Sequence, residues 1–190
     1  MEQNLVYKTM AATLTKFNIK YSQNDIDQWK GRAKKEVFQQ YIMHEGLLNI
    51  INQDFISNLG SRYKEDPNVT FDENIRIFFN DMRARGKYIA LNTGYSRETA
   101  DILINRFNLY DCVDFTITSD EVPKSRPEPH MINQIMKVFN VKPEECLVVG
   151  DTKNDVLAGK NAGTLTAIIN KNSYGANYVI SNVLDIKQLI

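Results

Sequence analysis

Residues 146–163, CLVVGDTKNDVLAGKNAG, decide the fold class of this chain. A short apolar run ends at Gly150 and Asp151, and a helical pattern begins near Thr152. A short apolar run that leads directly into a helix is typical of a parallel α/β unit. We therefore expect Asp151 to follow a buried strand.

The second half of the chain repeats this alternation of strand and helix. Helical patterns cover residues 71–86 and begin again near Ser96, Glu128 and Thr152. Strands separated by helices imply parallel pairing and right-handed crossovers. We predict an α/β, Rossmann-like three-layer fold with helices on both faces of a parallel sheet. Its strands are expected at residues 88–92, 115–118, 146–150, 166–170 and 178–180.

The first third of the chain has a helical pattern throughout. Apolar residues recur at spacings of three and four between Leu5 and Tyr63. Ser22 and Asp25 form an N-terminal capping pattern, and residues 44–60 read as an amphipathic helix closed by Gly60. We predict a helical subdomain over residues 5–68, followed by the α/β part over residues 69–190.

Composition and charge exclude several classes of protein. The 190 residues are 43% hydrophobic and 24% charged, which fits one globular domain with a subdomain rather than a disordered chain. Lys plus Arg and Asp plus Glu both total 23, so we expect no nucleic-acid coat. No signal peptide or apolar run long enough to span a bilayer is visible. Cys112 and Cys146 lack paired spacing, so we predict a reducing, cytoplasmic setting.

Ligands of open parallel sheets bind at the carboxyl ends of the strands, so the residues there are candidates for a site. Thr93 and Gly94 precede a helix near Ser96, which suits an anion, although Thr93 and Ser96 could also only satisfy the turn. Arg126 lies in PKSRPEPH, a loop stiffened by prolines. It could bind a phosphate or be a solvated charge.

Asp151 and Asp155 form a second candidate site, four residues apart at the end of a predicted strand. Two carboxylates there can hold a hard cation such as Mg²⁺. Alternatively, Thr152 and Asp155 form a capping pair. Capping does not account for Asp151, because a carboxylate directly after buried apolar residues is costly without a partner.

These residues together resemble the haloacid dehalogenase superfamily. Thr93 in NTG, Arg126 in SRPEP, and Asp151 with Asp155 in GDTKND occur in the order of its second, third and fourth motifs. TGYSRE and NLVYKT are most similar to the phosphonatase-like branch, the relatives of phosphonoacetaldehyde hydrolase. That branch places a helical cap before the second motif, as the helical pattern of residues 5–68 suggests.

The resemblance implies a Mg²⁺-dependent hydrolase, of phosphatase or phosphonatase type, that acts on a small phosphorylated metabolite through an aspartyl intermediate. Thr93 and Gly94 would contact the phosphoryl group. Arg126 would stabilise the nucleophile and the phosphate, and Asp151 would bind Mg²⁺ with support from Asp155.

The cap segment WKGRAKKEVF resembles the phosphonatase segment in which a glycine precedes a Schiff-base lysine by three residues. The equivalent residues here are Gly31 and Lys34, which makes Lys34 a candidate catalytic amine. Val37 stands where phosphonatase is expected to have a histidine. The alternative is that Lys34 lies on an ordinary solvated helix surface.

The family's first motif, a central strand followed by an Asp-x-x-Gly-Thr loop with the nucleophile, does not occur in this sequence. Asp25 and Asp27 belong to the helical subdomain and cannot replace it. We expect the sheet to lack its first central strand and the chain to have little or no turnover. Unpaired strand groups cost about 1 to 3 kcal/mol each, against a folding free energy of about 5 to 15 kcal/mol.

Three hypotheses follow from this expectation. The chain could be an N-terminally incomplete hydrolase, which we favour. It could instead be a non-catalytic module that binds phosphate and Mg²⁺. Finally, it could be an α/β interaction protein completed by a second copy or by a partner that donates a strand.

Overall fold

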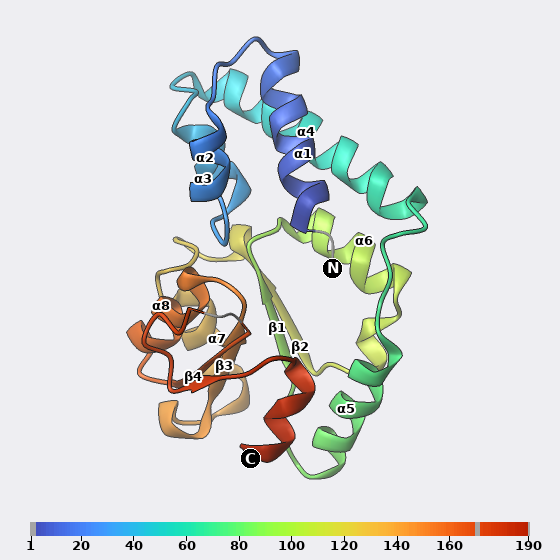
Figure 1. Ribbon diagram of the computed structural model, residues 1–190, viewed down its shortest axis with the longest axis vertical. Helices are drawn as coiled ribbons and strands as arrows, with labels where there is room; N and C mark the ends of the chain where they lie inside the picture. Colours follow the sequence, from blue (N-terminus) through green and yellow to red (C-terminus); the bar gives the residue numbers. More distant parts are fainter. Residues whose placement is uncertain (1–2, 170–171, 190) are drawn as a thin grey trace.

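The structure, a computed structural model, describes residues 3–169 and 172–189. A group of helices lies above an α/β region (Figure 1). These helices are α1 (Gln3–Lys16), α2 (Gln23–Gln28), α3 (Lys34–Gln39) and α4 (Glu45–Glu65). The predicted order, helices first and then a parallel α/β fold, is confirmed. The boundary at residues 68 and 69 stays a prediction.

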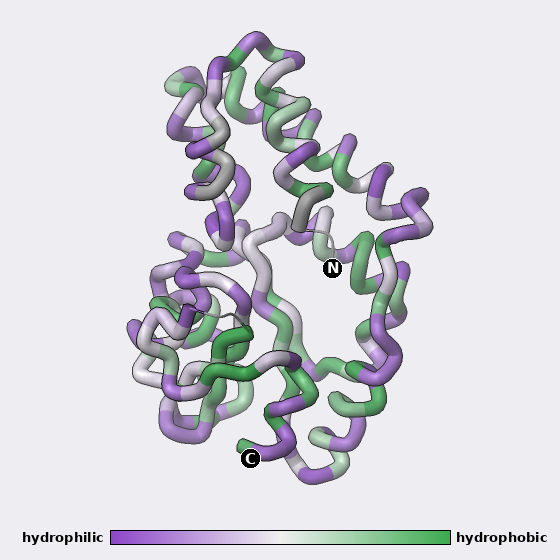
Figure 2. Tube along the Cα trace, in the orientation of Figure 1, coloured by the Kyte–Doolittle hydropathy of each residue, from purple (hydrophilic) through white to green (hydrophobic). Residues whose placement is uncertain are grey.

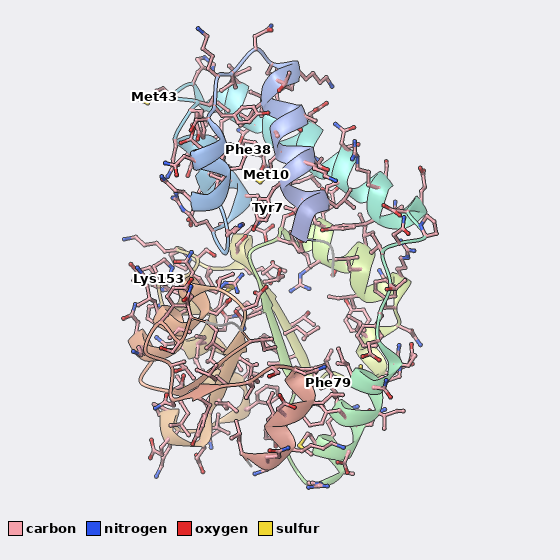
Figure 3. All side chains as sticks on the ribbon, in the orientation of Figure 1. Tyr7, Met10, Phe38, Met43, Phe79 and Lys153 are labelled. Carbon is pink, nitrogen blue, oxygen red and sulfur yellow. The ribbon has the colours of Figure 1, made fainter. Side chains whose placement is uncertain are left out.

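The helical region packs around one apolar cluster. Met10 from α1, Phe38 from α3 and Phe55 from α4 are all buried in it, together with Trp29. The rings of Phe38 and Phe55 meet edge to face at 5.3 Å between centroids. Figure 3 shows Met10 and Phe38 between the helices. Apolar side chains at helical spacing in α1, α3 and α4 are therefore buried on one side of each of these helices, as the periodicity predicts.

Of two helix-end signals predicted in this region, the cap at Ser22 is confirmed and the helix end at Gly60 is wrong. The backbone N–H of Ser22 donates to Asp25 Oδ2 at 2.7 Å, and the N–H of Asp25 points back to Ser22 Oγ at 3.3 Å, as in a capping box. Gly60, in contrast, does not close α4, which continues to Glu65. A Cβ on Gly60 would lie 2.8 Å from Ile102 Cδ1, so this glycine permits close packing between helices.

The α/β region alternates helices with short parallel strands, and every strand pair in it is parallel. The last residue of the strand predicted at residues 166–170 lies outside the described residues. The elements are α5 (Glu73–Ala84), β1 (Ala90–Thr93), α6 (Arg97–Arg106), β2 (Phe115–Thr118), α7 (His130–Phe139), β3 (Leu147–Gly150), α8 (Lys153–Asn161), β4 (Leu165–Ile168), β5 (Tyr178–Val179) and the 3₁₀ turn η4 (Val183–Gln188).

The strands form two sheets rather than one. One contains β1 and β2, and the other contains β3, β4 and β5 in that order. Within the described residues, no backbone hydrogen bond joins β1 to β3. This division is consistent with the predicted absence of a central strand.

Helices cover both faces of the divided sheet and bridge its two parts. On one face, α7 packs Met131 against Ile117 of β2 and Ile132 against Val148 of β3. On the other face, Phe78 of α5 lies in one cluster with Ile89, which precedes β1, and with Leu147 and Val149 of β3. Figure 2 shows hydrophobic stretches, in green, along strands of the α/β region. The three layers expected from the sequence are therefore present.

No helix in the described part of the chain is long and apolar enough to cross a membrane. Cys112 and Cys146 are both free thiols, as their spacing predicts.

Candidate functional site

The end of β1 forms a tight turn into α6. Thr93 Oγ1 accepts a hydrogen bond from the backbone N–H of Tyr95 at 3.2 Å, and the Ser96 side chain caps the helix. These bonds show that Thr93 serves the turn, which was one of the two alternatives. Gly94 allows a close approach, because a Cβ there would lie 3.1 Å from the carbonyl oxygen of Arg32 and 3.2 Å from Arg126 Nη2.

Arg126 is held inside the protein by an ion pair. Its Nη1 donates to Asp155 Oδ1, and the two side chains are only 13% and 6% exposed. The alternative that Arg126 is a solvated loop charge is therefore wrong. Its Nε is buried and has no hydrogen-bond partner within the described residues. The buried guanidinium consequently keeps one N–H available for an acceptor.

Asp155 has two structural partners. Its Oδ2 accepts hydrogen bonds from the backbone N–H of Thr152 at 3.0 Å and from Thr152 Oγ1 at 2.7 Å, which is the predicted capping pair. Gly150 makes room for this carboxylate, because a Cβ there would lie 2.3 Å from Asp155 Cγ. Asp151, directly after β3, is exposed. The two carboxylates therefore flank one strand end in different environments.

The carboxylates of Asp151 and Asp155 fit a Mg²⁺ ion whose remaining ligands come from water and substrate. Within the described residues there is no group of three or more His, Cys, Asp or Glu that could hold a metal. Mg²⁺ commonly uses one or two carboxylates and completes its shell with water and substrate phosphate. Gly150 leaves room for the Asp155 carboxylate beside the end of β3, which is compatible with such a site. The metal role of Asp151 and Asp155 stays a prediction.

Lys34 is the first residue of α3, and its amine points between two aromatic rings. Nζ lies 5.6 Å from the ring centroid of Tyr7 and 5.7 Å from that of Tyr95, and it donates to the carbonyl oxygen of Arg32 at 2.9 Å. The alternative of an ordinary solvated surface lysine is therefore wrong. Desolvation, followed by the charge of Arg126, lowers the pKa of Lys34 to about 7.

The tyrosines around Lys34 remain neutral at physiological pH. Burial raises the pKa of Tyr95 well above its usual range and also raises the pKa of Tyr7. The hydroxyls of Tyr63 and Tyr95 share a hydrogen bond of 2.7 Å. Tyr7 was not among the site residues predicted from the sequence. Its position three residues before the buried Met10, on the apolar stripe of α1, could have indicated that its side chain points inward.

A loop of the helical region covers the strand ends. Asn154 Nδ2 donates to the carbonyl oxygen of Lys30 at 3.2 Å, and a Cβ on Gly31 would lie 2.5 Å from Thr152 Oγ1. Gly31 has a φ of 75°, which favours glycine. Figure 3 shows Tyr7 and Lys153 on the two sides of this junction. The structure thus brings Gly94, Arg126, Asp155 and Lys34 to one place.

Comparisons with known proteins agree with this arrangement. Residues 2–169 match the family model described as haloacid dehalogenase-like hydrolase. The chain is 23% identical to pyrophosphatase PpaX of Bacillus cereus over 182 residues, which cover 92% of this chain and 80% of the relative.

Solved structures share the fold. A phosphonoacetaldehyde hydrolase-like protein from Oleispira antarctica matches with a TM-score of 0.81 and 17% identity, over 97% of this chain and 84% of its own. A β-phosphoglucomutase from Clostridium difficile matches with a TM-score of 0.83 and 16% identity, over 96% and 85%. With a family model that covers most of its length, this chain belongs to the haloacid dehalogenase-like hydrolase family.

Proposed function

We propose that this chain carries the phosphoryl-binding and Mg²⁺-binding part of a phosphatase-type site for a small phosphorylated metabolite. Thr93, Gly94 and Arg126 would hold the phosphoryl group, and Asp151 with Asp155 would hold the metal. Bound Mg²⁺ would neutralise negative charge on the phosphoryl oxygens.

The observation that carries this proposal is the position of Arg126. Its guanidinium lies against Gly94 at the end of β1 and is paired with Asp155 beside the end of β3. A planar guanidinium with a free, buried N–H suits a tetrahedral oxyanion. The Gly94 backbone, in the turn between β1 and α6, lies next to it.

We further propose that the chain on its own binds phosphate but turns over little substrate. The family chemistry needs a nucleophilic carboxylate, and an Asp-x-x-Gly-Thr sequence does not occur here. Contacts that bind ground state and transition state alike lower KM without raising kcat. A non-catalytic phosphate and Mg²⁺ module is therefore the main alternative.

Calorimetry tests the binding step. Inorganic phosphate titrated into the protein with MgCl₂ should give a saturable isotherm, weaker without Mg²⁺. Asp151→Asn should weaken the Mg²⁺ effect with little change in fold, because Asp151 is exposed. Asp111→Asn, an exposed acid elsewhere, is the matched control. Absence of heat at millimolar phosphate with Mg²⁺ would contradict the proposal.

A substrate panel tests turnover. It should include pyrophosphate and phosphonoacetaldehyde, which follow from the names of similar proteins. Phosphate release should stay near background on every member. Release that depends on Mg²⁺ and is lost in Arg126→Met would show that this chain is itself an active phosphatase.

A second candidate function is carbonyl chemistry at Lys34. Its amine is largely neutral above pH 7, and Tyr7 and Tyr95 enclose it. A neutral amine can condense with an aldehyde and release water, which gives an imine. Borohydride in the presence of phosphonoacetaldehyde should then fix the carbon skeleton on Lys34, detectable by mass spectrometry. If the Lys34→Met variant is labelled as strongly as the unchanged protein, this candidate function is wrong.

The cytoplasmic setting and a homo-oligomeric or strand-donating partner stay predictions. The two free thiols fit a reducing compartment.

A further inference from the structure

Met43 is the most exposed large apolar side chain among the described residues. It is 98% exposed and directly precedes His44, the N-cap residue of α4. Figure 3 shows Met43 on the outside of the helical region, whereas Met10 and Phe38 lie between the helices. A single exposed apolar side chain is ordinary, so the surface beside Met43 decides whether it marks an interface.

A hollow of about 330 Å³ adjoins Met43, between α3 and the start of α4. The buried side chains of Ile42 and Leu48 give the hollow an apolar floor, and Met43 forms part of its wall. Lys35 of α3 and Glu45 of α4 also line it, and both are exposed. A protruding apolar side chain and a hollow large enough to receive one therefore lie side by side.

The two charges on this hollow are of opposite sign. Within the described part of the chain, neither Lys35 nor Glu45 forms an ion pair. A partner with charges of only one sign would be repelled by one of these two side chains. A second copy of the chain brings both signs, so the Lys35 of each copy can face the Glu45 of the other. The formal net charge of zero also leaves no long-range repulsion between copies.

We infer that two copies of this chain associate at the hollow about a two-fold axis, with Met43 of each copy packed over Ile42 and Leu48 of the other. A two-fold interface uses the same surface on both copies, so a protrusion beside a hollow is matched twice. Met43 itself lines the hollow, so the two methionines lie near the axis. Methionine is enriched in interfaces and adapts its shape to irregular gaps, which suits this contact.

The contact is small, so we expect a weak dimer. Six residues line the hollow, whereas a standard interface has about 20 to 30 residues on each side. Small interfaces are transient, and we expect a Kd between about 1 μM and 1 mM. This inference goes beyond the proposed function, because the contact involves neither phosphate nor Mg²⁺. Failure of phosphate binding and failure of dimer formation are therefore separate results.

Sedimentation velocity of the full chain, without ligand, at protein concentrations from about 1 μM to 1 mM is the direct test. Met43→Asp should raise the Kd of the dimer about tenfold or more, because it places a carboxylate over the apolar floor of the second copy. Met43 is exposed in the single chain, so the fold should not change. Circular dichroism checks this.

Ile50→Asp is the matched control. Ile50 is 60% exposed on the same helix, but Glu45 and Leu48, which line the hollow, lie on another face of α4. This variant introduces the same charge as Met43→Asp and should leave the Kd unchanged.

An exchange of charges tests the two-fold arrangement. Lys35→Glu and Glu45→Lys should each raise the Kd about fivefold or more, because each variant brings like charges together at two places. An equimolar mixture of the two variants should regain the dimer. In the mixed dimer, both contacts again join opposite charges.

Three results would overturn the inference. The first is a monomer at every concentration up to about 1 mM. The second is a dimer that Met43→Asp leaves intact or that Ile50→Asp weakens equally, as expected of a dimer formed through the strands of the α/β region. The third is a mixture of the two charge variants that stays as monomeric as each variant alone.

Discussion

The helical region and the α/β region bury their apolar side chains in different ways. α1, α3 and α4 share one cluster that contains the largest fully buried side chains of the region, including Trp29, Phe38 and Phe55. The α/β region distributes its buried residues over three smaller clusters, on either side of a divided sheet.

The difference shows where each region gets its stability. Helices satisfy their own backbone groups, so the helical region needs only side-chain packing. A strand depends on its neighbours for hydrogen bonds, so the α/β region is incomplete wherever an edge is unpaired. The candidate site lies where the helical region meets the α/β region. Charged side chains, such as the Arg126–Asp155 pair, lie there between the two sheets, where no backbone hydrogen bonds join β1 to β3.

The largest effect is expected from a cavity in the helical region. Phe55→Ala should lower the free energy of unfolding by about 3 to 5 kcal/mol, because the fully buried ring also loses its contact with Phe38. Urea denaturation measures this loss. Met136→Ala, in a small cluster of the α/β region, should cost less, and Ile77→Ala on the surface should be nearly neutral. A larger loss for Met136→Ala would contradict the comparison.

The second effect tests the charged pair of the site. Arg126→Met should destabilise the protein by about 3 kcal/mol, because it leaves the Asp155 carboxylate buried without its cation. It should also abolish phosphate binding in calorimetry. Arg85→Met, which breaks an exposed pair with Asp81, should change stability by about 1 kcal/mol or less. Equal losses in the two variants would mean that burial of the pair is unimportant.

The third effect is the pH dependence of stability through Lys34. Its pKa is about 7 in the folded chain and 10.5 in the unfolded chain, so the unfolded chain binds the extra proton between these values. Stability should therefore rise with pH from about 7 to 8.5, by at most about 1.4 kcal/mol per pH unit. Urea midpoints at several pH values measure the slope.

Lys34→Met should remove this slope, and Lys35→Met, at an exposed neighbouring position, should keep it. Above about pH 9 the raised pKa values of Cys112 and Cys146 act in the opposite direction, so the lower window is the informative one. An identical slope in both variants would assign the pH dependence to other groups.

The smallest effect concerns the link between the two regions. Tyr95→Phe removes the hydrogen bond to Tyr63 and should cost about 1 kcal/mol in thermal or urea unfolding. Tyr63→Phe should cost a similar amount, and the double variant should cost less than the sum of the two. Strict additivity would show that the two hydroxyls do not interact.

Sequence patterns predicted the helices and strands of this fold better than they predicted the contacts between them. The apolar runs before Thr93 and Asp151 are strands, and the capping signals at Ser22, Ser96 and Thr152 all appear in the structure. These signals are local, because they depend on residues within one turn or one strand. The prediction that α4 ends at Gly60 failed because packing against Ile102, distant in sequence, decides the use of that glycine.

The sequence by itself determined the class of fold, the family and the residues that gather at the strand ends. Periodicity and spacing are enough for the fold class and the strand ends, because strand direction brings all carboxyl ends to one edge. The family was indicated by the resemblance of the motifs around Thr93, Arg126 and Asp151. Only the tertiary structure decided that Arg126 pairs with Asp155 and that Lys34 lies between Tyr7 and Tyr95. These contacts join residues far apart in sequence, and their geometry depends on how whole helices and sheets pack against each other.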